Sequence, residues 1–436
     1  MNLERYGPNR AEAALRLRAE AVTAELAAQK DQWRFGFTRR RVLAGAGAVG
    51  VAALGSQLVT TRVAFGDPAT TNRALIAIFL RGGMDGLSVV VPAGDANYKA
   101  ARPVIAVPDS VLIPAGRGFG LNPALAPLRP LWSAGQMAAV HAVASPDASR
   151  SHFQAQDCLE RGAASTSVHS GWLDRTLAAL GPGTTFRAVA EGSALPRSMV
   201  GGQDKVVLSG VANFKLSTPD NMRAKSVDAL RALYTGLDHP LSGQAELTLQ
   251  ALAAAAQVAK TPSSTTAGYP NGGFASSLKD VARLVKAKVG LRVATIDLGG
   301  WDMHTAIGKV DNGEMKTQLG ELAGTLAAFA ADLGPAMADT TVVTMSEFGR
   351  RVQENSNAGA DHGHGGVMLL LGGGLVGGQV HGRWPGLAAN ALDHGDLAGA
   401  NDYRDVLGEL LVRRMGVGAV TDIFPGHEYN RIGVFT

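Results

Sequence analysis

Acidic and imidazole side chains recur in this sequence just past short apolar runs, and their types are those that bind divalent metals. Asp85 follows one run, Asp302 and His304 follow a second, and Glu347 follows a third. Carboxylate and imidazole groups form a ligand set for Zn, Mn and similar ions. Each residue alone also has an ordinary role in a turn, a helix cap or a surface ion pair. If the four converge, the pattern predicts a site for one or two divalent metal ions.

The segment Asp361-His362-Gly363-His364 is the densest group of such residues in the chain. Two histidines around one glycine, directly after an aspartate, are rarely explained by packing alone. We expect Asp361, His362 and His364 to serve as ligands beside the carboxylates named above. The alternative is a polar glycine loop whose histidines contact only solvent or backbone.

The segment Ser149-Arg150-Ser151-His152 opens a predicted helix and contains candidate nucleophiles. A serine at this position is often only an N-cap. The N-terminus of a helix also stabilises an alkoxide or a transferred anion. We assign Ser151 as the candidate nucleophile, with Ser149 or a water molecule as alternatives. Arg150 and Arg350 are candidate catalytic groups that bind a developing oxyanion.

Short apolar runs alternate with longer helical patterns, and this order predicts the fold class. Expected strands are residues 75–80, 137–144, 291–298, 340–345 and 367–371; expected helices are 151–161, 241–260, 274–288, 318–333 and 403–414. The alternation predicts an α/β protein, a three-layer α/β/α domain with a mostly parallel central sheet. Ligands of such sheets bind beyond the carboxyl ends of the strands. We therefore expect the acidic and imidazole residues to share one edge.

Residues 1–66 have the pattern of a twin-arginine signal peptide with a long N-terminal extension. Residues 38–43 read Thr-Arg-Arg-Arg-Val-Leu, an uncharged Ala/Gly-rich stretch follows, and residues 64–66 are Ala-Phe-Gly. This order of charge, apolar run and small residues is that of a cleavable signal. The stretch is too weakly apolar for a stable membrane span. We expect residues 67–436 to form a single domain.

Such a signal implies export by the twin-arginine translocase to the periplasm, the cell envelope or the exterior. Cys158 is the only cysteine, so no internal disulfide can form, which suits folding in the reducing cytoplasm. Replacing Arg39 and Arg40 with Lys should leave unprocessed precursor in the cytoplasm. Normal processing of that double variant, measured by immunoblotting of cell fractions, would contradict the assignment.

The charge of the expected domain excludes some partners. Ten of the 41 basic and five of the 37 acidic residues lie in residues 1–66, which leaves 31 and 32 in the remainder. A nearly neutral domain gives no argument for binding nucleic acid or anionic membranes, and no later stretch is apolar enough to span a bilayer.

Two glycine patterns resemble a dinucleotide fingerprint. Residues 45–50 lie in the signal and 372–377 open no helix, so no nucleotide cofactor is expected.

Several motifs resemble those of a family of twin-arginine-exported bacterial proteins with a domain of unknown function. They run from the end of the signal almost to the C-terminus, at residues 79–87, 151–153, 156–157, 346–350, 361–363, 382–386 and 402–405. That family is placed in the alkaline phosphatase/sulfatase-like superfamily. The resemblance implies an alkaline-phosphatase-like fold and an exported metal-dependent hydrolase of small-molecule or polymeric phosphate or sulfate esters.

The superfamily's enzymes hold two metals with an aspartate after the first strand, a Ser/Thr nucleophile and later Asp and His ligands. By resemblance, Asp85 is the first ligand, Ser151 the nucleophile, and Asp302 with His304 an Asp/His pair. Glu347 stands where those enzymes commonly have Asp-His, which is a departure from the pattern. A single metal, or a non-catalytic envelope protein that keeps the fold and a metal site, is the alternative.

Overall fold

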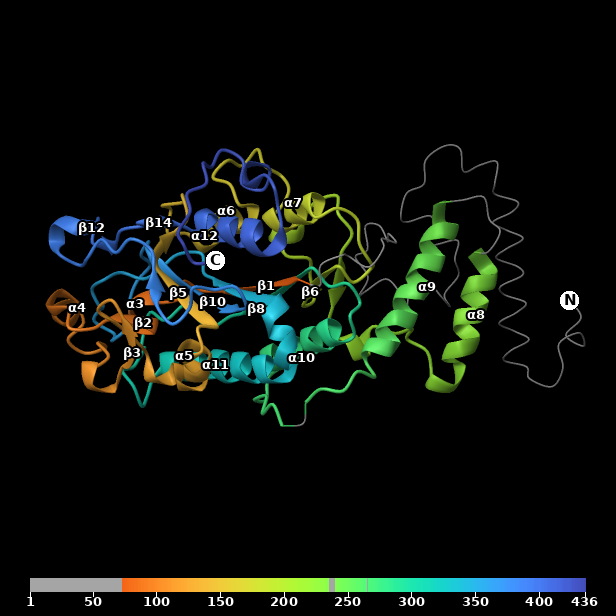
Figure 1. The fold of residues 1–436 in the computed structure, drawn as a ribbon, viewed down its shortest axis with the longest axis horizontal. Helices are drawn as coiled ribbons and strands as arrows, with labels where there is room; N and C mark the ends of the chain where they lie inside the picture. Colours follow the sequence, from red (N-terminus) through yellow and green to blue (C-terminus); the bar gives the residue numbers. More distant parts are fainter. Residues whose placement is uncertain (1–72, 235–239, 265) are drawn as a thin grey trace, which may run out of the picture.

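The computed structural model describes residues 73–234, 240–264 and 266–436, and its centre is a nine-stranded sheet (Figure 1). The strand order is β11-β5-β10-β9-β1-β8-β6-β7, and β14 also pairs with β5. Among these strands only β10 runs antiparallel to its neighbours. The predicted α/β class with a mostly parallel sheet is confirmed. The strands are β1 (Ala74–Leu80), β5 (Met137–Ala144), β6 (Ala188–Glu191), β7 (Val206–Leu208), β8 (Val293–Leu298), β9 (Thr340–Met345), β10 (Gly366–Gly372), β11 (Val380–His381) and β14 (Asn401–Asp402).

The central strand β1 shows why the sheet is buried on both faces. All seven of its residues are buried. Ile76 and Ile78 join one hydrophobic layer, whereas Leu75, Ala77 and Phe79 join the other. Successive side chains of a strand point to opposite faces, so a continuous apolar run is typical of a parallel strand covered on both sides.

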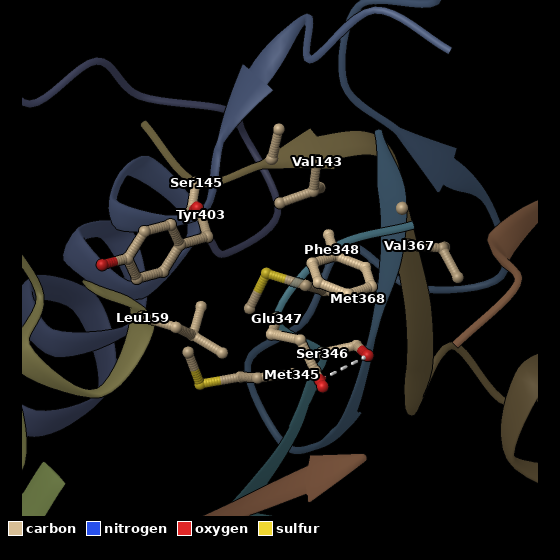
Figure 2. Close-up of a pocket in the computed structure, with 12 residues that line it drawn as sticks. Val143, Ser145, Leu159, Met345, Ser346, Glu347, Phe348, Val367, Met368 and Tyr403 are labelled. Atoms are coloured by element: carbon tan, nitrogen blue, oxygen red, sulfur yellow. Dashed lines mark hydrogen bonds between the residues drawn. The ribbon is translucent and has the colours of Figure 1, made fainter. Parts of the chain in front are cut away.

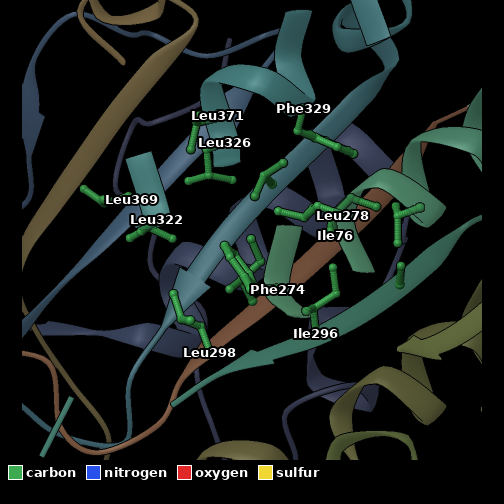
Figure 3. Packing of buried hydrophobic residues seen from close by; sticks show 14 of the residues in the cluster. Ile76, Phe274, Leu278, Ile296, Leu298, Leu322, Leu326, Phe329, Leu369 and Leu371 are labelled. Carbon is green, nitrogen blue, oxygen red and sulfur yellow. The ribbon is translucent and has the colours of Figure 1, made fainter. Parts of the chain in front are cut away.

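Helices cover both faces of the sheet (Figure 1). One layer consists of α5 (Arg129–Ser133), α10 (Gly273–Lys286) and α11 (Glu314–Leu333), and the other of α6 (His152–Arg161), α7 (Trp172–Ala179) and α12 (Tyr403–Leu410). Figure 3 shows Leu278 and Leu326 of the first layer near Ile76 and Leu371 of the sheet. Burial of each such side chain contributes about 1.5–3 kcal/mol to stability.

Smaller elements surround this core. A three-stranded sheet follows β1 with two short helices, a two-stranded hairpin precedes β14, and α8 and α9 lie side by side at one end of the molecule (Figure 1). The elements are α3 (Gly86–Val89), β2 (Val90–Pro92), α4 (Ala96–Ala101), β3 (Ile113–Gly116), β4 (Phe119–Leu121), α8 (Arg223–Tyr234), α9 (Pro240–Val258), β12 (Leu392–Asp393) and β13 (Asp396–Leu397).

Most predicted elements are present, with small shifts at their ends. The strands expected at 137–144 and 340–345 have those bounds. Between residues 164 and 240, where no element was predicted, the structure has α7, β6, β7 and α8. Two of these are strands of three or four residues. The predicted signal, residues 1–66, lies outside the described residues. Within the described part of the chain, no helix has the length and apolar character needed to cross a membrane.

Candidate metal centre

Loops from five strands meet at one edge of the sheet. β1, β8 and β9 are parallel and end there. β10 runs the other way and begins there, where Gly366 pairs with Val143 near the end of β5. The segments after β1, β5, β8 and β9 and the segment before β10 therefore share this edge, which is where parallel sheets bind ligands.

Three imidazole nitrogens surround one carboxylate oxygen at this edge. Oδ1 of Asp302 lies 3.1 Å from Nε2 of His304, 3.2 Å from Nε2 of His362 and 3.5 Å from Nε2 of His152. The Nε2 atoms of His304 and His362 are 3.0 Å apart. Ligand atoms about 2.0–2.1 Å from a tetrahedral zinc ion are separated from one another by about 3.3 Å. The four measured separations fit this spacing.

Two of the imidazoles are oriented by carboxylates on their Nδ1 atoms. Nδ1 of His152 lies 2.8 Å from Oε1 of Glu347. Nδ1 of His304 lies 3.0 Å from Oδ1 of Asp361. Because a carboxylate only accepts hydrogen bonds, the proton of each neutral ring is assigned to Nδ1 and the lone pair to Nε2. Carboxylate–histidine pairs of this kind orient metal ligands in proteins.

The third imidazole, His362, is oriented by the backbone. Its Nδ1 atom donates to the carbonyl oxygen of Arg150 at 2.9 Å. All three rings therefore direct an Nε2 lone pair towards Asp302. Nε2 of His152 is buried and has no hydrogen-bond partner among the described residues. The ligand atoms of His152, Asp302 and His362 all lie within 4.8 Å of one another, so a cation bound among these three would give the buried Nε2 atom of His152 a partner.

Glu347 is buried next to His152, and one of its carboxylate oxygens accepts three hydrogen bonds. Its Oε1 atom accepts from His152, from Gln156 Nε2 at 2.9 Å and from the Gly82 amide at 2.9 Å. Burial alone would raise the pKa of Glu347, but these hydrogen bonds outweigh it and the pKa lies below its ordinary value. Figure 2 shows Glu347 with Ser346 on the wall of a small cavity between β5, β9, β10 and α6.

The Glu347→Gln variant should weaken metal binding without changing the fold. Glutamine keeps the shape of the side chain but loses its negative charge. It also has one oxygen and one NH2 group in place of two carboxylate oxygens, so it accepts hydrogen bonds from the three donors around Oε1 less well. Loss of an outer-shell partner commonly costs about 10–100-fold in metal affinity. A zinc titration of the apoprotein measures the change. Affinity equal to wild type would show that Glu347 does not orient a ligand.

The charged groups that contact these rings have a negative net charge. Burial acts to raise the pKa of Asp302, but the hydrogen bond and the charge of Arg350 outweigh it and lower the pKa to about 2. Hydrogen bonds from Asn355 and His304 lower the pKa of Asp361. With Glu347, three carboxylates are ionised near neutral pH beside one guanidinium. Two negative charges remain, which one divalent cation would neutralise.

Arg350 joins the loops that carry the ligands. Its buried guanidinium donates from Nε to the carbonyl of Gly83 at 2.6 Å, from Nη1 to Ala360 at 3.0 Å and from Nη2 to Trp301 at 3.2 Å. Nη2 also donates to Oδ1 of Asp302 at 2.6 Å. Its donors are therefore engaged with protein acceptors. We place Arg350 as a positioning residue, although its sequence position predicted a group that binds a substrate oxyanion.

Glycines allow the same loops to approach closely. Gly82 has φ of +121°, and a Cβ atom there would lie 2.5 Å from the amide nitrogen of Asp302. A Cβ atom at Gly363 would lie 2.4 Å from the carbonyl carbon of Arg350. Both contacts are too short for any side chain. Gly-Gly after β1 and the glycine between the two histidines are therefore structural requirements of the site.

Asp85 lies outside the imidazole cluster. Both of its carboxylate oxygens are bound by Arg102, at 2.5 and 2.9 Å, and Ser88 Oγ donates at 2.5 Å. Arg102 also donates to the carbonyls of Arg351 and Val352. Asp85 thus ties the first loop to the segment after Arg350, and we do not include it among the proposed ligands.

His364 and the Arg150 guanidinium also point away from the cluster. Nε2 of His364 lies 3.2 Å from the carbonyl oxygen of Ser145, and its Nδ1 is 3.6 Å from Asp393. The Arg150 side chain binds buried Asp396. Of the segment Asp361-His362-Gly363-His364, one histidine joins the cluster and the aspartate orients His304. Asp361 and His362 therefore contact His304, whereas His364 contacts Ser145 instead.

The candidate nucleophiles lie at the start of α6. Ser151 is the N-cap residue, and its side chain makes no capping hydrogen bond. Ser149 Oγ donates to Asp147 at 2.6 Å. Ser151 is therefore free of the local bond that occupies Ser149, and it directly precedes His152.

His152 was not among the residues predicted to bind metal. At this helix start the sequence pointed to Ser151 as a nucleophile and not to its neighbour. His152 and Gln156 are four residues apart and therefore share one helix face. A histidine and a glutamine one turn apart, in the first helix after β5, were the available signal. The ring of Phe348 packs against two of the imidazoles. Its centroid lies 4.9 Å from that of His152 and 4.7 Å from that of His362.

Comparison with known proteins identifies the family of this chain but no characterised relative. The model of one family, described as a protein of unknown function (DUF1501), matches residues 132–399. The match covers more than half of the chain and contains all three imidazoles and Asp302. A search among curated proteins finds no match.

Proposed function

Because the chain belongs to the DUF1501 family of proteins of unknown function, we propose its function from the site: a hydrolase of phosphate or sulfate esters that uses one divalent metal. Export of the protein is part of this proposal. The observation that supports it best is the set of three Nε2 atoms around Asp302, each opposite an Nδ1 atom held by an acceptor. Zn and Mn suit such imidazole and carboxylate ligands.

We assign His152, His304, His362 and Asp302 as the residues that would hold the ion. A bound divalent ion would supply positive charge that stabilises an anionic ester and lowers the pKa of a nucleophile. The side chains of Asp302 and His304 are 51 % and 41 % exposed, so a substrate can reach the site from solvent. The single cluster favours one metal rather than two.

The nucleophile is proposed to be Ser151 or water. The first turn of α6 presents backbone N–H groups beside His152, and a helix N-terminus favours an anion there. Asp302 remains ionised under neutral conditions, and Arg350 fixes its orientation. A Ser151→Ala variant that retains activity would assign the reaction to water.

The test of this function is ester hydrolysis that depends on added metal. We expect purified residues 67–436, stripped by chelator and reloaded with Zn or Mn, to hydrolyse a p-nitrophenyl ester of phosphate or sulfate. Asp302→Ala should lower the rate by about 100-fold or more, because a removed ligand frees the ion. Metal-loaded protein that turns over neither ester would contradict the hydrolase proposal.

A second candidate is a non-catalytic protein that binds the same ion. The proposed site takes all four of its ligands from the protein. Zinc sites with four protein ligands are commonly structural, whereas catalytic sites keep a position open. Under this alternative, metal raises the melting temperature but no ester is hydrolysed. The reloading experiment separates the two candidates.

A further inference from the structure

The three imidazoles of the candidate site differ in the burial of the groups that hold their Nδ1 atoms. Nδ1 of His152 is bonded to Glu347, whose side chain is 1 % exposed, and Nδ1 of His362 is bonded to a backbone carbonyl. His304 is the most exposed of the three rings, at 41 %, and its partner Asp361 is 56 % exposed. A charged contact this exposed adds little by itself, because water screens it and both side chains can rotate. The direction of His304 therefore depends on further contacts.

Asn355 makes hydrogen bonds to both members of this exposed pair. Its side-chain Nδ2 donates to Oδ1 of Asp361 at 3.0 Å and to the backbone carbonyl of His304 at 2.9 Å. Asp361 uses the same Oδ1 atom to contact Nδ1 of His304 at 3.0 Å. The three residues thus form a closed ring of contacts, although His304 follows β8 and the other two lie between β9 and β10.

The oxygen of the Asn355 side chain shapes its own loop. Oδ1 accepts from the amides of Asn357 at 3.0 Å and Gly359 at 3.1 Å, so Nδ2 is the end of the side chain that faces Asp361. The loop also packs tightly against the segment after β8, because a Cβ atom at Gly359 would lie 2.2 Å from the carbonyl carbon of His304. These contacts hold Nδ2 in place beside its two acceptors.

We propose that Asn355 is a positioning residue, which holds Asp361 against Nδ1 of His304 and so directs Nε2 of His304 towards Asp302. This inference rests on the proposed function, because it concerns a ligand of the same metal site. Asn355 acts through Asp361, so neither the ion nor a substrate needs to touch it. Its effect is on the affinity for the ion, because a ring that is free to rotate must be ordered when the ion binds, and this ordering costs affinity.

Zinc titration of the purified apoprotein, with a competing chelator, tests the inference. We expect Asn355→Ala to bind zinc about tenfold more weakly than wild type, at the lower end of the loss caused by removal of an outer-shell partner. Asn355→Ser should lose as much, because its hydroxyl can replace the acceptor of the loop turn but is too short to reach Asp361. Asn357→Ala is the matched control and should bind as wild type does, because Asn357 bonds to Asn355 and Ala306 through its backbone.

Two further measurements distinguish positioning from a general effect on the fold. Asp361→Ala alone should also weaken zinc binding about tenfold. The double variant with Asn355→Ala should bind no more than about twofold more weakly than Asp361→Ala, because the losses of residues that act through one contact do not add. The visible spectrum of cobalt-loaded Asn355→Ala should shift towards that of cobalt-loaded His304→Ala, since both change the same nitrogen ligand. Circular dichroism of the apoproteins shows that each variant is folded.

The outcomes separate the positioning role from the function on which it rests. Wild-type affinity in Asn355→Ala, or a double variant whose loss is the product of the two single losses, overturns the role of Asn355 and leaves the metal site standing. An equal loss in Asn357→Ala overturns it as well, because the loop as a whole would then be the cause. If wild type binds no zinc, the proposed function fails and the positioning role fails with it.

Discussion

The His362→Ala variant is expected to lose tight metal binding, whereas His364→Ala keeps it. The two histidines are two residues apart, but only His362 places its Nε2 atom near Asp302 and His304, at 3.2 and 3.0 Å. His364 instead contacts the carbonyl of Ser145. Removal of a direct ligand should cost more than the roughly 10–100-fold seen for outer-shell partners, so we expect a loss above about 100-fold.

Zinc titration with a competing chelator measures both affinities, and circular dichroism of the apoproteins shows whether each variant folds. His364→Ala is the matched control, because it removes the same side chain from the same loop. Equal losses in the two variants would indicate a general disturbance of the loop. Loss in His364→Ala alone would place the ion on the other side of the segment and contradict the site.

The Asp85→Ala variant should lower the free energy of unfolding by about 3–5 kcal/mol while the folded protein still binds metal. Arg102 is fully buried, and removal of Asp85 would leave its charge without a counter-ion. Burial acts to raise the pKa of Asp85, but the Arg102 charge and hydrogen bonds lower it. The stabilisation is therefore complete above the unfolded-state pKa of about 3.9 and decreases as the pH falls below it.

Urea unfolding at neutral pH measures the loss in stability, and zinc titration of the folded variant measures binding. The double variant Asp85→Leu with Arg102→Met should recover much of the stability, because it replaces both charges with apolar groups. The opposite pattern, in which Asp85→Ala keeps its stability and loses metal, would show that Asp85 is the ligand implied by the family resemblance.

The order of elements along the sequence was enough to predict the mostly parallel sheet and the edge at which its polar loops meet. Fully apolar runs such as residues 75–80 have few alternatives to a buried strand, and a short stretch of polar residues marks where each one ends. β6 and β7 could not be predicted, because strands of three or four residues carry too little periodicity. The antiparallel direction of β10 also leaves no mark in its sequence, since it is buried on both faces like its parallel neighbours.

Residue types predicted which side chains meet at this edge better than they predicted the contacts of each one. Asp302 and His362 lie together in the cluster, whereas Glu347 and Asp361 contact the Nδ1 atoms of His152 and His304. These contacts depend on the direction in which each loop side chain points. That direction is set by the conformation of loops that contain glycines with positive φ, such as Gly82, and residue types alone do not reveal it. Asp85 was assigned from its position after β1, and its partner Arg102 lies on a segment that no local pattern connects to it.

Elemental analysis of the purified protein tests the metal site most directly. The wild-type chain, saturated with zinc or manganese and freed of excess ion, should retain about one divalent ion per chain. Asp302→Ala should retain far less under the same conditions. The site as described is contradicted if wild type retains no divalent ion, or if Asp302→Ala retains as much as wild type.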